Sequence, residues 1–122
     1  MILEPGIKVL IAHRRLFEGD QPRYFVGQVE GYGDGLARVI GYTWTRDPYQ
    51  GLYVRKSDER TKIVPIASGT VIVYQLPATV RLEDFVLVAE GAILIAHDGA
   101  AFRMDLSEGQ IHAAPAPALR RA

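Results

Sequence analysis

The sequence predicts an all-β fold, a single-domain antiparallel β-barrel or sandwich of about eight or nine short strands. Apolar segments are short and rich in Val, Ile, Tyr and Phe, which is typical of strands. Turn-forming clusters of Gly, Pro, Asp and Ser recur about every ten residues, as in barrels and sandwiches. The helical patterns of about 10–15 residues that a βαβ architecture needs between its strands are not found.

Strands are expected wherever such an apolar segment lies between two turn clusters. These segments, in chain order, are Ile7–Phe17, Tyr24–Tyr32, Leu36–Arg46, Leu52–Lys56, Lys62–Ile66, Thr70–Leu76, Phe85–Glu90, Ala92–His97 and Ala101–Leu106. Asp34-Gly35 and Asp98-Gly99 are sequences that favour tight β-turns, so each predicts a hairpin between its flanking strands. The second of these hairpins is expected to extend over Ala92–Leu106.

Length and composition indicate one globular unit. A chain of 122 residues with 48% hydrophobic and 23% charged residues is typical of a single domain with its own core. We expect this domain to cover residues 1–106. Residues 107–122 are rich in Ala and Pro and predict a flexible C-terminal tail, because they offer little apolar surface to bury.

Charge and cysteine content narrow the classes of function. Fourteen basic and fourteen acidic side chains give a formal net charge of zero, which disfavours a partner that is held by bulk electrostatics. The chain has no cysteine, which excludes disulfides, thiol nucleophiles and cysteine-ligated metals. It begins without a basic segment followed by a long apolar run, so we expect a cytoplasmic protein that does not enter a membrane.

The segment Arg38–Lys56 combines the single tryptophan of the chain with several tyrosines and basic residues around an Asp-Pro-Tyr-Gln-Gly turn. Strand alternation places Tyr42 and Trp44 on one face, together with Arg46. A second strand, Ile7–Phe17, carries His13 and Arg15 on the face of its apolar residues. Aromatic rings beside arginines suit a small anionic ligand or a protein partner, and core packing of the aromatics is the alternative. The candidate ligand-binding residues are Tyr42, Trp44, Arg46, Tyr49, Tyr53, Arg55, His13 and Arg15.

Three functions follow from this reading. The preferred one is a small non-enzymatic β-barrel binding or interaction module with its aromatic and arginine contact region at 38–56. The second is a single-stranded nucleic-acid-binding domain of the OB or SH3-like type, which would use the same side chains for stacking and phosphate contacts. The third is a small enzyme that uses His13 or His97 with a carboxylate.

No catalytic residue, metal ligand or cofactor is assigned from the sequence, because no motif for these chemistries occurs. The segment Phe85–Ile95 contains two apolar strands with few charges. Unpaired strand edges of this kind promote self-association, so a homo-oligomer formed through edge strands is also expected.

Overall fold

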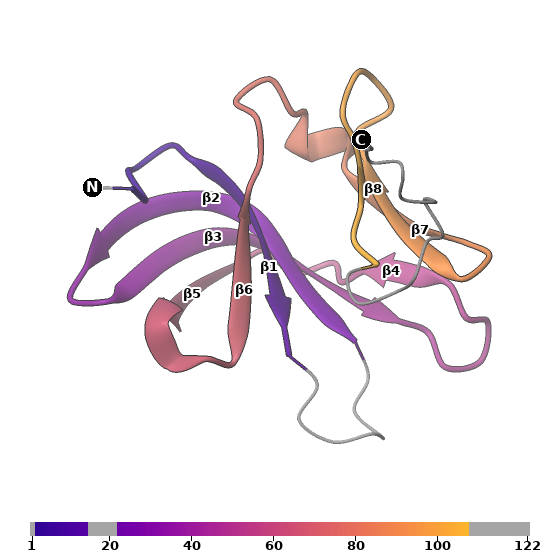
Figure 1. Ribbon diagram of the computed structural model, residues 1–122, viewed down its shortest axis with the longest axis horizontal. Helices are drawn as coiled ribbons and strands as arrows, with labels where there is room; N and C mark the ends of the chain where they lie inside the picture. The colour runs from indigo at the N-terminus through magenta and orange to yellow at the C-terminus, as the bar shows by residue number, and fades with distance from the viewer. Residues whose placement is uncertain (1, 15–21, 108–122) are drawn as a thin grey trace, which may run out of the picture.

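The computed structural model describes residues 2–14 and 22–107 and shows an all-β chain with two antiparallel sheets (Figure 1). The elements in chain order are β1 (Lys8–His13), β2 (Arg23–Gly33), β3 (Leu36–Arg46), β4 (Tyr53–Arg55), β5 (Arg60–Pro65), the 3-10 turn η1 (Ile66–Ser68), β6 (Val71–Gln75), the 3-10 turn η2 (Leu82–Asp84), β7 (Val86–Glu90), β8 (Ile93–His97) and β9 (Arg103–Asp105). Among these described residues, no helix is long and apolar enough to cross a membrane.

The large sheet has the strand order β4-β3-β2-β1-β6, and β5 also pairs with β3. Strands β4 and β5 pair with different parts of β3: β4 pairs with residues 44–46 and β5 pairs with residues 36–41. The small sheet has the order β7-β8-β9. Within the described residues the two sheets remain separate and do not close into one barrel.

The predicted fold class is confirmed, and each predicted segment contains an observed strand. At the β2–β3 turn, Asp34 and Gly35 both have positive φ, which is the backbone that tight hairpins require. The hairpin over Ala92–Leu106 is also observed, as the antiparallel pair β8–β9. The predicted continuation of the first strand to Phe17 lies mostly outside the described residues, and so does the tail from residue 108 onward. That residues 1–106 form one domain stays a prediction.

Buried side chains form two clusters, one on each face of the large sheet. The inner cluster consists of Val9, Ile11, Phe25, Val29, Ala37, Val39 and Val64. Its members all come from β1, β2, β3 and β5, so the large sheet itself curls around them. The inter-sheet cluster consists of Leu10, Val26, Trp44, Leu76, Val80, Phe85, Leu87, Leu94, Ala96 and Leu106. It joins the two sheets by burying apolar surface of both.

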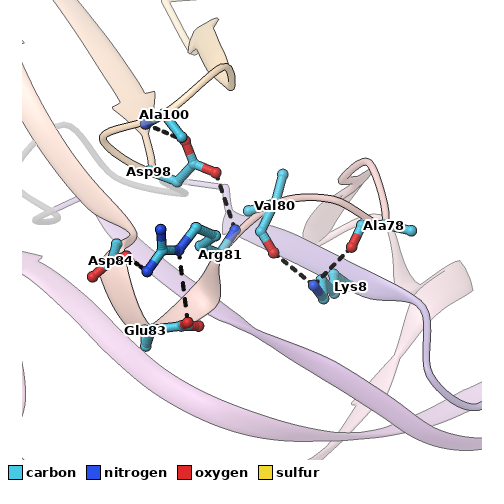
Figure 2. A network of polar contacts seen from close by, with 8 residues as sticks. All are labelled: Lys8, Ala78, Val80, Arg81, Glu83, Asp84, Asp98 and Ala100. Atoms are coloured by element: carbon cyan, nitrogen blue, oxygen red, sulfur yellow. Dashed lines mark hydrogen bonds and ion pairs between the residues drawn. The ribbon is translucent and has the colours of Figure 1, made fainter.

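The connection between the sheets, residues 77–85, is held from both sides (Figure 2). From β1, the Lys8 ammonium donates hydrogen bonds to the carbonyl oxygens of Ala78 at 2.8 Å and Val80 at 2.6 Å. From the end of β8, the Asp98 carboxylate accepts the backbone N–H of Arg81 at 3.0 Å. These bonds fix where η2 lies relative to both sheets.

Replacement of Asp98 by asparagine is expected to destabilise the fold. Its carboxylate accepts backbone N–H groups from Arg81, Ala100 and Phe102, and these bonds hold the pKa of Asp98 below its usual value, although burial opposes the shift. Hydrogen bonds to a charged acceptor are the stronger ones, so Asp98→Asn should lower the melting temperature at pH 7 by roughly 5 °C.

The same bonds predict a pH dependence. Because the folded-state pKa is depressed, the stabilisation by Asp98 is present above the unfolded-state value of about 3.9 and is lost as the pH falls through the folded-state value. Melting temperatures of the wild type and Asp98→Asn should therefore converge in acid. A gap of constant size from pH 7 to pH 2 would contradict this role for the carboxylate.

Candidate functional site

A pocket of about 470 Å³ lies where the large sheet meets η2 and the start of β7. Strands β2 and β3 form one side of it, β4 and the residues after it contribute a second side, and η2 closes a third. The lining residues are Val26, Gly27, Gln28, Ile40, Gly41, Tyr42, Trp44, Arg55, Glu59, Leu82, Glu83 and Phe85. A volume of this size is in the range of small-molecule sites.

The aromatic part of the lining is built on Trp44 and Phe85. Their ring centroids are 6.5 Å apart with an interplanar angle of 68°, an edge-to-face arrangement. Trp44 is 6% exposed and belongs to the inter-sheet cluster, so it is a core residue that also borders the pocket. Core packing, one of the two alternatives for this tryptophan, is thus observed, and its contact with a ligand stays a prediction.

The rim of the pocket carries a stacked pair, Tyr42 and Arg55. The guanidinium carbon of Arg55 lies 4.3 Å from the centre of the Tyr42 ring, which is a cation–π contact. Antiparallel pairing sets this geometry, because Arg55 on β4 is the partner of Trp44 on β3. The turn before β4 keeps that register: the backbone N–H of Gly51 donates to the carbonyl oxygen of Asp47 at 2.8 Å.

Polar lining comes from Gln28, Glu59 and Glu83, in addition to Arg55. One guanidinium and two carboxylates line the pocket. Arg55 could therefore pair with an anionic group of a ligand, and Glu59 and Glu83 could pair with cationic groups. Glu83 also lies 3.8 Å from the side chain of Arg81, an exposed ion pair that is worth little energy. The arrangement can stack a flat molecule and can accept and donate hydrogen bonds at its edge.

The candidate residues from the sequence are divided by the structure. Tyr42, Trp44 and Arg55 meet in the pocket just described. Arg46 and Tyr53 border a different pocket of about 500 Å³ beside the β7–β8 turn.

Tyr49 and His13 lie away from both of these pockets. Tyr49 is 95% exposed at the tip of the β3–β4 turn. His13 lies at the end of β1, and Arg15 lies outside the described residues. The seven candidates that the structure describes therefore do not share one pocket.

Several lining residues were not found from the sequence. Gln28 and Phe85 lie in predicted strands, and Glu59, Leu82 and Glu83 lie between predicted strands, without any further signal in the sequence. The proximity of Leu82, Glu83 and Phe85 to Trp44 results from the packing of the connection 77–85 against the large sheet, which no local pattern encodes.

The partners of the histidines bear on the third function, an enzyme that uses His13 or His97 with a carboxylate. The Nδ1 atom of His97 accepts the backbone N–H of Gly99 at 3.2 Å, and neighbouring Asp98 accepts backbone N–H groups. The Nε2 atom of His13 is buried without a hydrogen-bond partner. Among the described residues, neither histidine forms a hydrogen bond or ion pair with a carboxylate. Within residues 2–14 and 22–107, no group of three or more His, Cys, Asp or Glu side chains is placed to hold a metal ion.

Comparison with known proteins gives one partial similarity. No family model matches the chain, and no solved structure matches it. A phytol kinase from Synechocystis sp. (strain ATCC 27184 / PCC 6803 / Kazusa) is 41% identical over 71 residues, which is 58% of this chain. The match covers 30% of the length of that kinase.

Proposed function

We propose that the chain is a small non-enzymatic β-domain that binds a ligand in the pocket beside Trp44. The observation that carries this proposal is the Arg55–Tyr42 stack, which places a cation and an aromatic face next to a buried tryptophan at the edge of an open cavity. Such a combination of an apolar wall with a few convergent polar groups is characteristic of binding pockets. It lies within the predicted contact region, residues 38–56.

The lining favours a small flat molecule with mixed polarity. Trp44 and Phe85 offer apolar contact, and Arg55 would pair with an acceptor or an anionic group of the ligand. Glu59 and Glu83 would accept hydrogen bonds from donors on the same molecule. An aromatic amino acid or a nucleobase has this pattern, whereas a ligand with several negative charges would be repelled by the two carboxylates.

Nucleic-acid binding and catalysis rank below this proposal. A single strand would place phosphates beside Glu59 and Glu83, which opposes the stacking contribution of the rings. The partial similarity to a phytol kinase suggests phosphoryl transfer as an enzymatic alternative, but it covers 30% of that protein. Activity with phytol and a nucleoside triphosphate would establish that alternative.

The cytoplasmic location and the homo-oligomer remain proposals. Strand β7 is an edge of the small sheet, and Val88 on it is 37% exposed. An unpaired edge with an apolar side chain is suited to association with a second copy. A protein partner on the same edge is the other possibility.

The proposal is tested by fluorescence of Trp44, because the chain has a single tryptophan. The protein is titrated with nucleosides, aromatic amino acids, small anions and short single-stranded oligonucleotides. A ligand seated against Trp44 should change its emission in a saturable way. Arg55→Gln and Tyr42→Leu should each weaken that ligand about tenfold, which corresponds to a loss of about 1.4 kcal/mol.

Arg46→Gln is the matched control, because Arg46 belongs to the same hairpin but borders the other pocket. It should leave the affinity unchanged. Equal weakening by Arg46→Gln and Arg55→Gln would indicate a diffuse electrostatic effect and contradict the assigned pocket. A panel that leaves the Trp44 emission unchanged throughout would also contradict it.

A further inference from the structure

A second group of side chains lies on the opposite face of the large sheet, where the inner cluster ends. Alternation along β1 places His13 on the face of Val9 and Ile11. The antiparallel partner of His13 on β2 is Arg23. Lys62 on β5 reaches over the same face, with its ammonium 4.6 Å from the centre of the Phe25 ring. We refer to His13, Arg23 and Lys62 as the basic trio.

The basic trio has no counter-charge among the described residues of this face. The strand positions on the face of the inner cluster, from β1, β2, β3, β5 and β6, are Val9, Ile11, His13, Arg23, Phe25, Gly27, Val29, Tyr32, Ala37, Val39, Gly41, Thr43, Thr45, Arg60, Lys62, Val64, Val71, Val73 and Gln75. None of these is acidic. Arg60 adds a fourth basic group and forms an exposed ion pair with Asp58 at 3.6 Å.

The pKa values of His13 and Lys62 are both lowered, as expected for basic groups that are partly buried beside other cations. Burial lowers the pKa of His13, and the charges of Lys62 and Arg23 lower it further. Burial likewise lowers the pKa of Lys62, with contributions from Arg23 and Arg60. In addition, the buried Nε2 atom of His13 has no hydrogen-bond partner, although an unsatisfied buried polar atom costs free energy.

Among the neighbours that the structure describes on β6 and directly after β1, none supplies a negative charge. On the adjacent strand β6, the partner of His13 is Val71, which carries no charge. Arg14, which directly follows β1, does not face the basic trio. Its guanidinium donates a hydrogen bond to the carbonyl oxygen of Gly69 at 3.1 Å. Basic side chains that lie close together without an acidic neighbour are a common arrangement for holding an anion.

We propose that the basic trio is a binding site for a small oxyanion of the phosphate or sulfate type. The guanidinium of Arg23 and the ammonium of Lys62 would contact the anion directly. The negative charge of the anion would favour the imidazolium form of His13 and so raise the pKa of this side chain. This site is separate from the Trp44 pocket, because its residues on β1, β2 and β5 lie on the other face of the large sheet. Its test does not depend on the ligand of that pocket.

The test follows the ring protons of the histidines by NMR in the full chain. Inorganic phosphate is the probe, and sodium chloride at equal ionic strength is the reference that accounts for screening. Phosphate should raise the pKa of His13 saturably, by about one pH unit, and should leave His97 unchanged. His13→Gln identifies the His13 signal.

Variants then assign the contacts. Arg23→Gln and Lys62→Gln should each abolish the phosphate response while raising the pKa of His13 in its absence, because each removes a repelling cation. Arg38→Gln is the matched control, since Arg38 is an exposed arginine on the opposite face of β3, and it should keep the response. Arg23 is exposed, so its variant is expected to fold even if Lys62→Gln does not.

Four outcomes would overturn the proposal. In the first, the pKa of His13 responds no more to phosphate than to chloride, and in the second, His13 and His97 respond equally. In the third, the Arg23→Gln variant keeps the full phosphate response. In the fourth, His13 responds to a short single-stranded oligonucleotide but not to phosphate. The last outcome would instead assign the face to a nucleic-acid strand.

Discussion

Replacement of Trp44 by alanine is expected to lower the free energy of unfolding by about 3–5 kcal/mol. Trp44 is 6% exposed and packs with Leu10, Val26 and Phe85 in the cluster that joins the two sheets. Truncation removes a large ring from this junction and leaves a cavity that the neighbouring strands cannot fill without moving. The loss should therefore weaken the contact between the sheets as well as the pocket.

The measurement is urea unfolding followed by far-UV circular dichroism, because the substitution removes the fluorescent residue. Tyr49→Ala serves as the control, since Tyr49 is 95% exposed and its loss should change the free energy of unfolding by less than about 0.5 kcal/mol. A cost below about 1 kcal/mol for Trp44→Ala would contradict its role in the core. In the wild type, the burial of Trp44 should also give a blue-shifted emission.

The second large effect is expected at the glycine pair Gly27 and Gly41, which face each other across β2 and β3. A Cβ atom built on Gly27 would overlap the carbonyl oxygen of Ile40 and lie 2.8 Å from the Cα atom of Gly41. A Cβ atom on Gly41 would overlap the carbonyl oxygen of Val26 and lie 2.6 Å from the Cα atom of Gly27. These neighbours are backbone atoms, so neither clash can be relieved by a side-chain rotation.

Either Gly27→Ala or Gly41→Ala should therefore cost more than about 4 kcal/mol or prevent folding, because β2 and β3 would have to separate at the centre of the large sheet. The matched control is Gly33→Ala, also in β2, where an added Cβ meets no atom within 4 Å. That control should stay within about 1 kcal/mol of the wild type. Melting curves of the three variants provide the comparison, and a stable Gly27→Ala protein would contradict the close approach of the strands.

The glycine pair also affects both faces of the large sheet, the one with the Trp44 pocket and the one with the inner cluster. Gly27 and Gly41 let the backbones of β2 and β3 approach closely, while the same strands present Tyr42 and Trp44 to the pocket on one side and support the inner cluster on the other. Without room for this approach, the large sheet could not curl around Phe25 in the way that is observed. A defect at either glycine should therefore disturb both faces together.

The strands and hairpins were predictable from the sequence because their signals are local. Alternation of apolar and polar residues and a turn such as Asp34-Gly35 act over a few residues, and both were confirmed. Alternation also predicts that the side chains of Tyr42 and Trp44 lie on one face of a strand, and both line the same pocket. The ligand role of that pocket remains a proposal.

Tertiary structure decided the rest, because it depends on contacts between residues far apart in the chain. Alternation does not say whether a face of β3 is covered by the small sheet, so it could not show that Phe85 packs against Trp44 or that Glu83 reaches the pocket. The approach of Lys62 to His13 likewise depends on how β5 pairs with β3 and how the large sheet curls. Local periodicity thus determined which residues form strands, whereas the burial of apolar surface between distant segments determined which side chains meet.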